Sequence, residues 1–168
     1  MPINVVAAAS SLVLISQGQP EEMPMFKHIL IATDGSELAE RAAAQGLELG
    51  KLLGASVTAV MVTEPWSAMI TGATAQTFYE QYAKASADDA ARALAAISEL
   101  AKTAGLTCAT THVKDQYPAE GVIATCKDRG CDLIVMGSHG RRGLARLFLG
   151  SEAAKVLSLS TVPVLICR

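Results

Sequence analysis

Glycines and arginines gather in one short stretch near the C-terminus, in the pattern Gly137-x2-Gly140-x9-Gly150-Ser151. The first two glycines carry no Cβ, so the backbone there can turn sharply and approach a ligand closely. The last pair is expected to begin a helix, whose unpaired N–H groups and positive dipole end favour an anion. Arginine is well suited to phosphate oxygens. Three arginines lie inside the stretch: Arg141, Arg142 and Arg146. The chemistry favoured by this combination is the binding of a polyphosphate.

A buried strand and a helix are expected on either side of this stretch. Leu133 to Met136 are apolar without alternation, which is typical of a strand in a parallel sheet covered on both faces. Strands and helices alternate along the rest of the chain, and this order predicts a parallel α/β sheet. We expect strands at 28–33, 56–63, 106–113, 133–136 and 163–167. Helices are expected at 36–53, 118–128 and 151–159. A further helix is expected to follow a long connection from 64 to 74 and to end at about 102.

The predicted fold is α/β, a doubly wound five-stranded parallel sheet in the order 3-2-1-4-5 with helices on both faces. In that order the first and fourth strands are neighbours at the topological switch point. Open α/β sheets bind ligands there, beyond the carboxyl ends of the strands. Asp34 follows the first strand and Gly137 ends the fourth. Two motifs that lie far apart in the sequence are therefore expected to meet in one crevice.

Three segments resemble the universal stress protein family. Phe26 to Ser36 is similar to the first strand and the Asp-Gly-Ser turn of these proteins. The pattern from Gly137 to Ser151 is similar to the nucleotide-binding signature of the members that carry ATP, and it likewise follows a strand and precedes a helix. Val162 to Ile166 resembles the last strand of these domains. The resemblance predicts a universal stress protein domain at 26–168 and an N-terminal extension at 1–25 outside it.

The resemblance implies an adenine nucleotide α-hydrolase-like fold with ATP, held with Mg²⁺, in the crevice. The protein is then a stress-response sensor or regulatory module, whose bound state is read by a protein partner that the sequence does not identify. Adenine is expected between the first two strands and the phosphates over the glycine loop, with the segments 64–75 and 141–149 ordering around them. The residues expected to contact the nucleotide are Ala32, Thr33, Asp34, Met61, Val62, Met136, Gly137, His139, Gly140, Arg141, Gly150, Ser151 and Glu152.

The resemblance also implies a homodimer. Pro163 to Cys167 is expected to be an outer edge strand, and exposed apolar edges tend to be covered. The family often pairs through this strand.

The expected location is the cytoplasm. The four cysteines form no C-x-x-C pair and no metal spacing, and they are interpreted as small apolar residues in a reducing compartment.

Each site residue also has a structural interpretation. Asp34 can cap the following helix, with Glu37 completing a capping box. The glycines can simply shape a turn, the His139 side chain can face solvent, and the arginines can form a solvated face.

Two other functions of the protein stay open as well. One is a slow ATP hydrolase or phosphotransferase, although no Walker loop, G-x-S-x-G or H-E-x-x-H motif occurs and no catalytic residue is assigned. The other is a structural stress dimer that binds no nucleotide.

Composition argues against nucleic-acid and membrane partners. A chain of 168 residues fits one domain that folds without metal or disulfides. Its formal net charge of −2 and aromatic content of 4% give no support for a nucleic-acid surface. The apolar run within residues 5–15 is too short to span a bilayer and has no Lys or Arg before it, so neither a membrane span nor a signal peptide is predicted.

The N-terminal residues 1–25 are interpreted as a tail that follows an upstream start codon, with Met23 or Met25 beginning the domain. A strand at Leu12 to Ile15 that docks on a sheet edge or a partner is the alternative.

Overall fold

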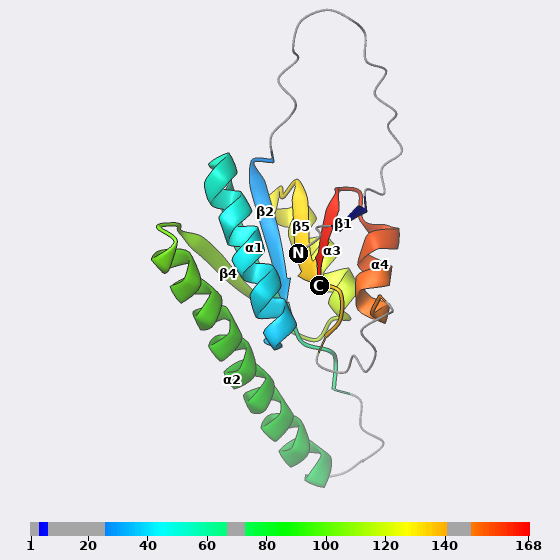
Figure 1. Cartoon of the computed structure of the whole chain (residues 1–168). Coiled ribbons are helices and arrows are strands. Elements are labelled where there is room, and N and C mark those ends of the chain that lie inside the picture. Colours follow the sequence, from blue (N-terminus) through cyan, green and yellow to red (C-terminus); the bar gives the residue numbers. More distant parts are fainter. Residues whose placement is uncertain (1–3, 7–25, 67–72, 141–148) are drawn as a thin grey trace, which may run out of the picture.

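A computed structural model describes residues 4–6, 26–66, 73–140 and 149–168 (Figure 1). The described strands are β1 (Asn4–Val6), β2 (His28–Thr33), β3 (Ser56–Val62), β4 (Cys108–Val113), β5 (Leu133–Gly137) and β6 (Val164–Cys167). The helices are α1 (Glu37–Leu53), α2 (Ala73–Thr103), α3 (Pro118–Arg129) and α4 (Ser151–Leu159). The predicted alternation is confirmed, with boundaries shifted by one or two residues. None of the helices in these described ranges is both long and apolar enough to cross a membrane.

The strands form one sheet in the order β1-β6-β5-β2-β3-β4. From β6 to β4 all neighbouring strands are parallel, so the predicted five-stranded order 3-2-1-4-5 is confirmed. β2 and β5 are neighbours, with Ala32 opposite Met136. The loops that follow these two strands therefore leave the sheet side by side, at its switch point.

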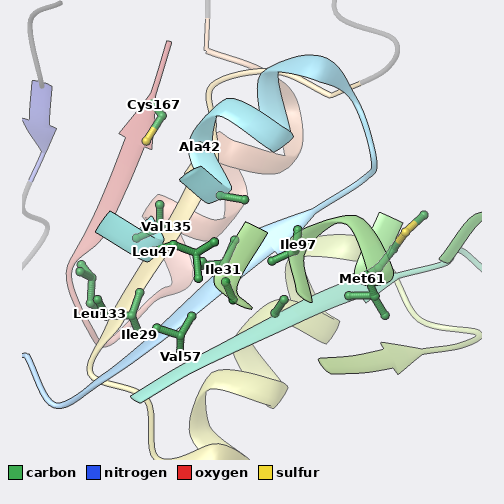
Figure 2. Close-up of a cluster of buried hydrophobic side chains, with 14 of the residues drawn as sticks. Ile29, Ile31, Ala42, Leu47, Val57, Met61, Ile97, Leu133, Val135 and Cys167 are labelled. Carbon is green, nitrogen blue, oxygen red and sulfur yellow. The ribbon is translucent and has the colours of Figure 1, made fainter. Parts of the chain in front are cut away.

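Helices cover both faces of the sheet (Figure 1). Successive side chains of β2 alternate between the two faces: Ile29 and Ile31 pack with α1 and α2, whereas Leu30 packs with α3 and α4. Figure 2 shows the first cluster, in which Leu47 of α1 and Ile97 of α2 lie against the strand side chains. Burial on both faces explains the unbroken apolar runs in the strands. It also makes the sheet a fixed platform for the loops at its carboxyl edge.

The start of α1 differs from the predicted capping box. Ser36 is the N-cap, and its Oγ accepts a hydrogen bond from the Ala39 N–H at 3.3 Å. Asp34 lies outside the helix, and its Oδ1 accepts a hydrogen bond from the Ser36 N–H at 3.1 Å. Gly35 between them has a φ of 74°, which glycine adopts without strain. The capping interpretation of Asp34 is therefore wrong, and the tight turn keeps its carboxylate at the end of β2.

Residues Asn4–Val6 change two expectations about the N-terminus. They form β1, which pairs antiparallel with β6, with Val5 opposite Leu165. The tail interpretation is therefore wrong for these three residues, and β6 is not the outer edge that the sequence predicted. A docked strand is the better description, although the segment predicted for it, Leu12 to Ile15, lies outside the described residues.

Candidate functional site

A cavity of about 570 Å³ opens at the carboxyl ends of β2, β3 and β5. Its volume is within the range of about 300–1,000 Å³ that is usual for small-ligand sites. The predicted contact residues that line it are Ala32, Thr33, Asp34, Met61, Val62, Met136, Gly137, His139, Gly140, Gly150, Ser151 and Glu152. Arg141, the remaining one, lies outside the described residues. The fold thus brings the predicted residues together, while their contacts with a ligand stay a prediction.

The two sequence motifs meet at Gly140. A Cβ built on Gly140 would lie 2.8 Å from Oδ2 of Asp34. The φ of Gly140 is not positive, so the position needs glycine for this close approach and not for an unusual backbone conformation. The Asp34 carboxylate therefore lies against the bare backbone of the loop after β5. A ligand in the crevice would meet both.

The N-terminus of α4 faces the same cavity. Gly150 is the N-cap, and a glycine has no side chain with which to cap the helix. The first-turn N–H groups of α4, at the positive end of the helix dipole, therefore receive no hydrogen bond from a side chain of their own N-cap residue. The Gly150 N–H donates to the Ser138 carbonyl oxygen at 2.8 Å, and a Cβ on Gly150 would lie 3.1 Å from that oxygen. The loop and the helix thus pack backbone to backbone, an arrangement that suits a phosphate group.

His139 is oriented by its neighbour Ser138. Ser138 Oγ and His139 Nδ1 lie 2.8 Å apart, and Ser138 is 1% exposed. The other ring nitrogen, Nε2, is buried and has no hydrogen-bond partner within the described residues. Because a buried polar atom without a partner is costly, a ligand group that bonds to Nε2 would remove that cost. The interpretation of His139 as a solvent-facing side chain therefore does not fit.

The Glu152 carboxylate is engaged within the protein. Its Oε2 accepts a hydrogen bond from the Ala119 N–H at 3.0 Å, and its Oε1 lies 2.7 Å from Lys155 Nζ. Ala119 is in the first turn of α3, whose N-cap, Tyr117, makes no side-chain capping bond. Glu152 of α4 thus satisfies one of the orphan N–H groups of α3. This leaves the backbone N–H of Glu152, rather than its side chain, as the group suited to an anion.

We expect Glu152→Ala to lower the free energy of unfolding by about 1–2 kcal/mol, because the Ala119 N–H loses a charged acceptor. If the cavity binds the ATP that the resemblance implies, the affinity should change by less than about 3-fold, which corresponds to under 1 kcal/mol. Urea unfolding and calorimetric titration measure the two effects. Glu152→Gln, which keeps an acceptor oxygen, is the matched control and should restore part of the stability. Loss of affinity without loss of stability would show that the carboxylate itself contacts the ligand.

One wall of the cavity was not predicted from the sequence. It is formed by α2, through Tyr82, Ser86 and Asp89. Their spacing of four and three residues places them on one face of the helix. The Tyr82 hydroxyl also donates to the Glu64 carbonyl oxygen at 2.8 Å, which ties α2 to the segment after β3. The sequence signal for this wall was the row of polar residues beside the apolar face of α2. Such a row does not by itself show which loops the helix faces.

The described lining of the cavity is acidic. It contains Asp34, Glu64, Asp89 and Glu152, and none of the described lining residues is a lysine or an arginine. Positive charge for a polyphosphate would come from the amides of α4 and from the arginines within 141–148, which lie outside the described residues. Within the described ranges no cluster of three or more His, Cys, Asp or Glu side chains could hold a metal.

The other two histidines bond to threonines. His28 Nε2 lies 2.8 Å from Thr58 Oγ1, and His112 Nε2 lies 3.1 Å from Thr63 Oγ1. Burial, and then the charge of Lys114, lower the pKa of His112, so its ring is neutral near pH 7. Each histidine links β3, or the residue after it, to a neighbouring strand. This supports a structural role for both.

Comparisons with known proteins agree with this fold. The sequence model of the universal stress protein family matches residues 25–168. A universal stress protein of Thermus aquaticus is 33% identical over 144 residues, which cover 86% of this chain and 100% of that protein. The structure of hypothetical protein MJ0577, from Methanocaldococcus jannaschii, aligns with a TM-score of 0.71 and 27% identity over 85% of this chain and 96% of its own. A universal stress protein in complex with cAMP aligns with a TM-score of 0.59 and 21% identity, over 86% of this chain and 98% of its own. A universal stress protein from Archaeoglobus fulgidus in complex with dAMP aligns with a TM-score of 0.59 and 17% identity, over 86% of this chain and 99% of its own. This chain belongs to the universal stress protein family.

Proposed function

We propose that the protein binds ATP in the cavity beyond β2, β3 and β5, and that it acts as a sensor or regulatory module in a stress response. The observation that carries the proposal is the meeting of Asp34, the backbone at Gly140 and the glycine-initiated start of α4 in one cavity. An anion meets amides on one side, and a nucleoside meets an apolar wall on the other. The adenine nucleotides found in two structures with this fold support the choice of base.

The nucleotide is proposed to lie along the carboxyl edge of the sheet. Adenine would pack against Met61 and Val62, which line the cavity at the end of β3. Asp34 would accept hydrogen bonds from the ribose. The phosphates would run over Gly140 toward the amides of α4, with the arginines within 141–148 supplying charge. Mg²⁺, when bound, neutralises phosphate charge, and this chain's own contribution is to hold and orient the nucleotide.

The bound state is proposed to be the signal. A partner distinguishes the ATP-bound protein from the empty one only if its affinity for the two differs. The segments that were expected to order around the nucleotide lie largely outside the described residues, at 67–72 and 141–148.

The first experiment is to denature the purified protein and analyse the supernatant by ion-exchange chromatography, then to titrate the emptied, refolded protein with ATP in a calorimeter. We expect ATP or ADP to co-purify and the titration to saturate, with weaker binding when EDTA removes Mg²⁺. Absence of nucleotide together with no heat or competition at millimolar ATP would overturn the proposal and favour a structural dimer. Steady ATP turnover that is lost in Asp34→Asn would instead favour the hydrolase alternative.

We further propose residues 26–168 as the ligand-binding domain and residues 1–25 as an accessory segment. The proposed location is the cytoplasm, which is consistent with the free thiols of the four cysteines. We also propose a homodimer through β6, which forms only when β1 is displaced from that strand. Since β1 pairs with β6, a second copy can use that edge only after β1 has left it.

A further inference from the structure

The turn that ends α3 brings two cysteines together. Gly130 has a φ of 65°, and the Cys131 N–H donates to the Cys126 carbonyl oxygen at 2.9 Å. The Gly130 N–H donates to the Lys127 carbonyl oxygen at 3.1 Å. These two bonds define a Schellman motif, in which the first and last residues commonly place their side chains in contact. Here those two residues are cysteines, and Cys126 Sγ lies 3.4 Å from the Cys131 carbonyl oxygen.

Both thiols lie just beneath an exposed turn. Cys126 is 4% and Cys131 is 6% exposed, and both belong to the apolar cluster under α3 and α4. Residues 127–130, which join them, are all exposed. The two remaining cysteines are far apart, because Cys108 is in the edge strand β4 and Cys167 is in β6, near the opposite edge of the sheet. Cys126 and Cys131 are therefore the cysteine pair that the fold brings close together.

We propose that Cys126 and Cys131 are a redox modification site, at which a hydroperoxide converts the two thiols into a reversible disulfide across the α3–β5 turn. The direct backbone hydrogen bond holds the two residues close, as a disulfide requires. An oxidant-formed, reducible bond is also the kind of disulfide that a reducing compartment permits. The proposal rests on the turn and is independent of nucleotide binding.

The surroundings give the two cysteines different roles. A hydrogen bond from the Cys131 thiol lowers the pKa of Cys126, and the same bond, followed by burial, raises the pKa of Cys131. These directions favour Cys126 as the nucleophile and Cys131 as the resolving thiol, and the trapping experiment below distinguishes this order from the reverse.

The chemistry balances with a hydroperoxide as the oxidant. The Cys126 thiolate attacks the peroxide, the O–O bond breaks, and a sulfenic acid and one molecule of water or alcohol form. The Cys131 thiol then attacks the Cys126 sulfur. The S–S bond forms, the S–O bond breaks, and the hydroxide leaves with the thiol proton as water. Small thiols reverse the oxidation by thiol–disulfide exchange.

Peptide mapping tests the proposal on the folded, full-length protein. The sample is treated with hydrogen peroxide, alkylated in denaturant and digested with trypsin without reduction. Cleavage after Lys127 and Arg129 separates the two cysteines, so a disulfide would join peptides 115–127 and 130–141. We expect this linked pair, lighter by two hydrogens than the sum of its parts, and we expect a thiol reductant to release it.

Matched variants separate this bond from general oxidation. Cys126→Ala and Cys131→Ala should each abolish the linked pair, whereas Cys108→Ala and Cys167→Ala should leave it unchanged. Cys131→Ser, which keeps a hydrogen-bond donor beside Cys126 but no resolving thiol, should trap a sulfenic acid on Cys126 that reacts with dimedone. Full alkylation of Cys126 and Cys131 at a peroxide dose that oxidises Cys108, the most exposed of the four, would overturn the proposal. So would a linkage that appears only when the protein is oxidised in denaturant.

Discussion

Replacing Gly140 with tryptophan is expected to weaken ATP binding by at least about 100-fold, or about 2.7 kcal/mol. Even a methyl group at this position would lie 2.8 Å from Oδ2 of Asp34, and an indole ring would occupy the space between the loops that follow β2 and β5. Gly140 is exposed and its φ is not positive, so its backbone conformation suits other residues, and the close contact falls on the end of the Asp34 side chain, which has to move. Calorimetric titration of the emptied protein measures the loss. Thermal unfolding should show a nearly unchanged midpoint.

A second tryptophan variant controls for the added ring. Thr107 is exposed and lies just before β4, at the amino edge of the sheet, opposite the cavity. Thr107→Trp should bind ATP like the parent protein. Gly150→Ala provides a contrast, since its Cβ would press on the Ser138 carbonyl oxygen and should reduce stability as well as binding. If Gly140→Trp titrates like the parent, the nucleotide does not pass over this loop. Partner binding that persists in Gly140→Trp would contradict the proposed nucleotide switch.

The parallel core was predictable because its signals are local. Strands such as 29–32 and 133–136 are apolar on both faces, and helix ends carry their own marks, such as the left-handed glycines Gly54 and Gly130. Once the strand order follows from handedness, the switch point places Asp34 beside the glycine loop. The meeting of these motifs thus follows from topology.

Features that depend on contacts between distant segments were not predictable. The role of Glu152 depends on where α3 lies, because its carboxylate satisfies an N–H group thirty-three residues away. The cavity wall on α2 depends on how the helix crosses the sheet, and a polar stripe such as Tyr82, Ser86 and Asp89 is equally compatible with solvent. Pairing of the short strand β1 with β6 likewise has no local signal beyond two valines and an apolar neighbourhood.

Releasing β1 is expected to strengthen self-association through β6. We expect the full-length double variant Val5→Pro/Val6→Pro to form a homodimer with a dissociation constant at least about 10-fold lower than that of the parent. Backbone hydrogen bonds alternate along an antiparallel pair, so proline at two adjacent positions removes a donor from whichever residue faces β6. The three residues of β1 then cannot hold the edge.

The size of this effect follows from the fraction of molecules whose edge is free. Binding through a state populated at fraction f weakens the apparent affinity by 1/f, and by 1/f² when both copies must open. If β1 occupies the edge about 90% of the time, the penalty on the dimer is about 100-fold, and the proline variant removes it. A three-residue strand makes few hydrogen bonds, each with a net value of about 0.5–1.5 kcal/mol, so occupancy in this range is reasonable.

Sedimentation equilibrium over a range of concentrations measures the dissociation constant, and Ser10→Pro/Ser11→Pro is the matched control because its prolines lie outside β1. The control should behave like the parent protein. Unchanged self-association in Val5→Pro/Val6→Pro would mean that β6 is not a dimer surface, or that β1 does not restrict it. Weaker self-association would mean that β1 itself pairs with the β6 edge of a second copy. Only stronger self-association supports β1 as a segment that competes with the partner for the edge of the sheet.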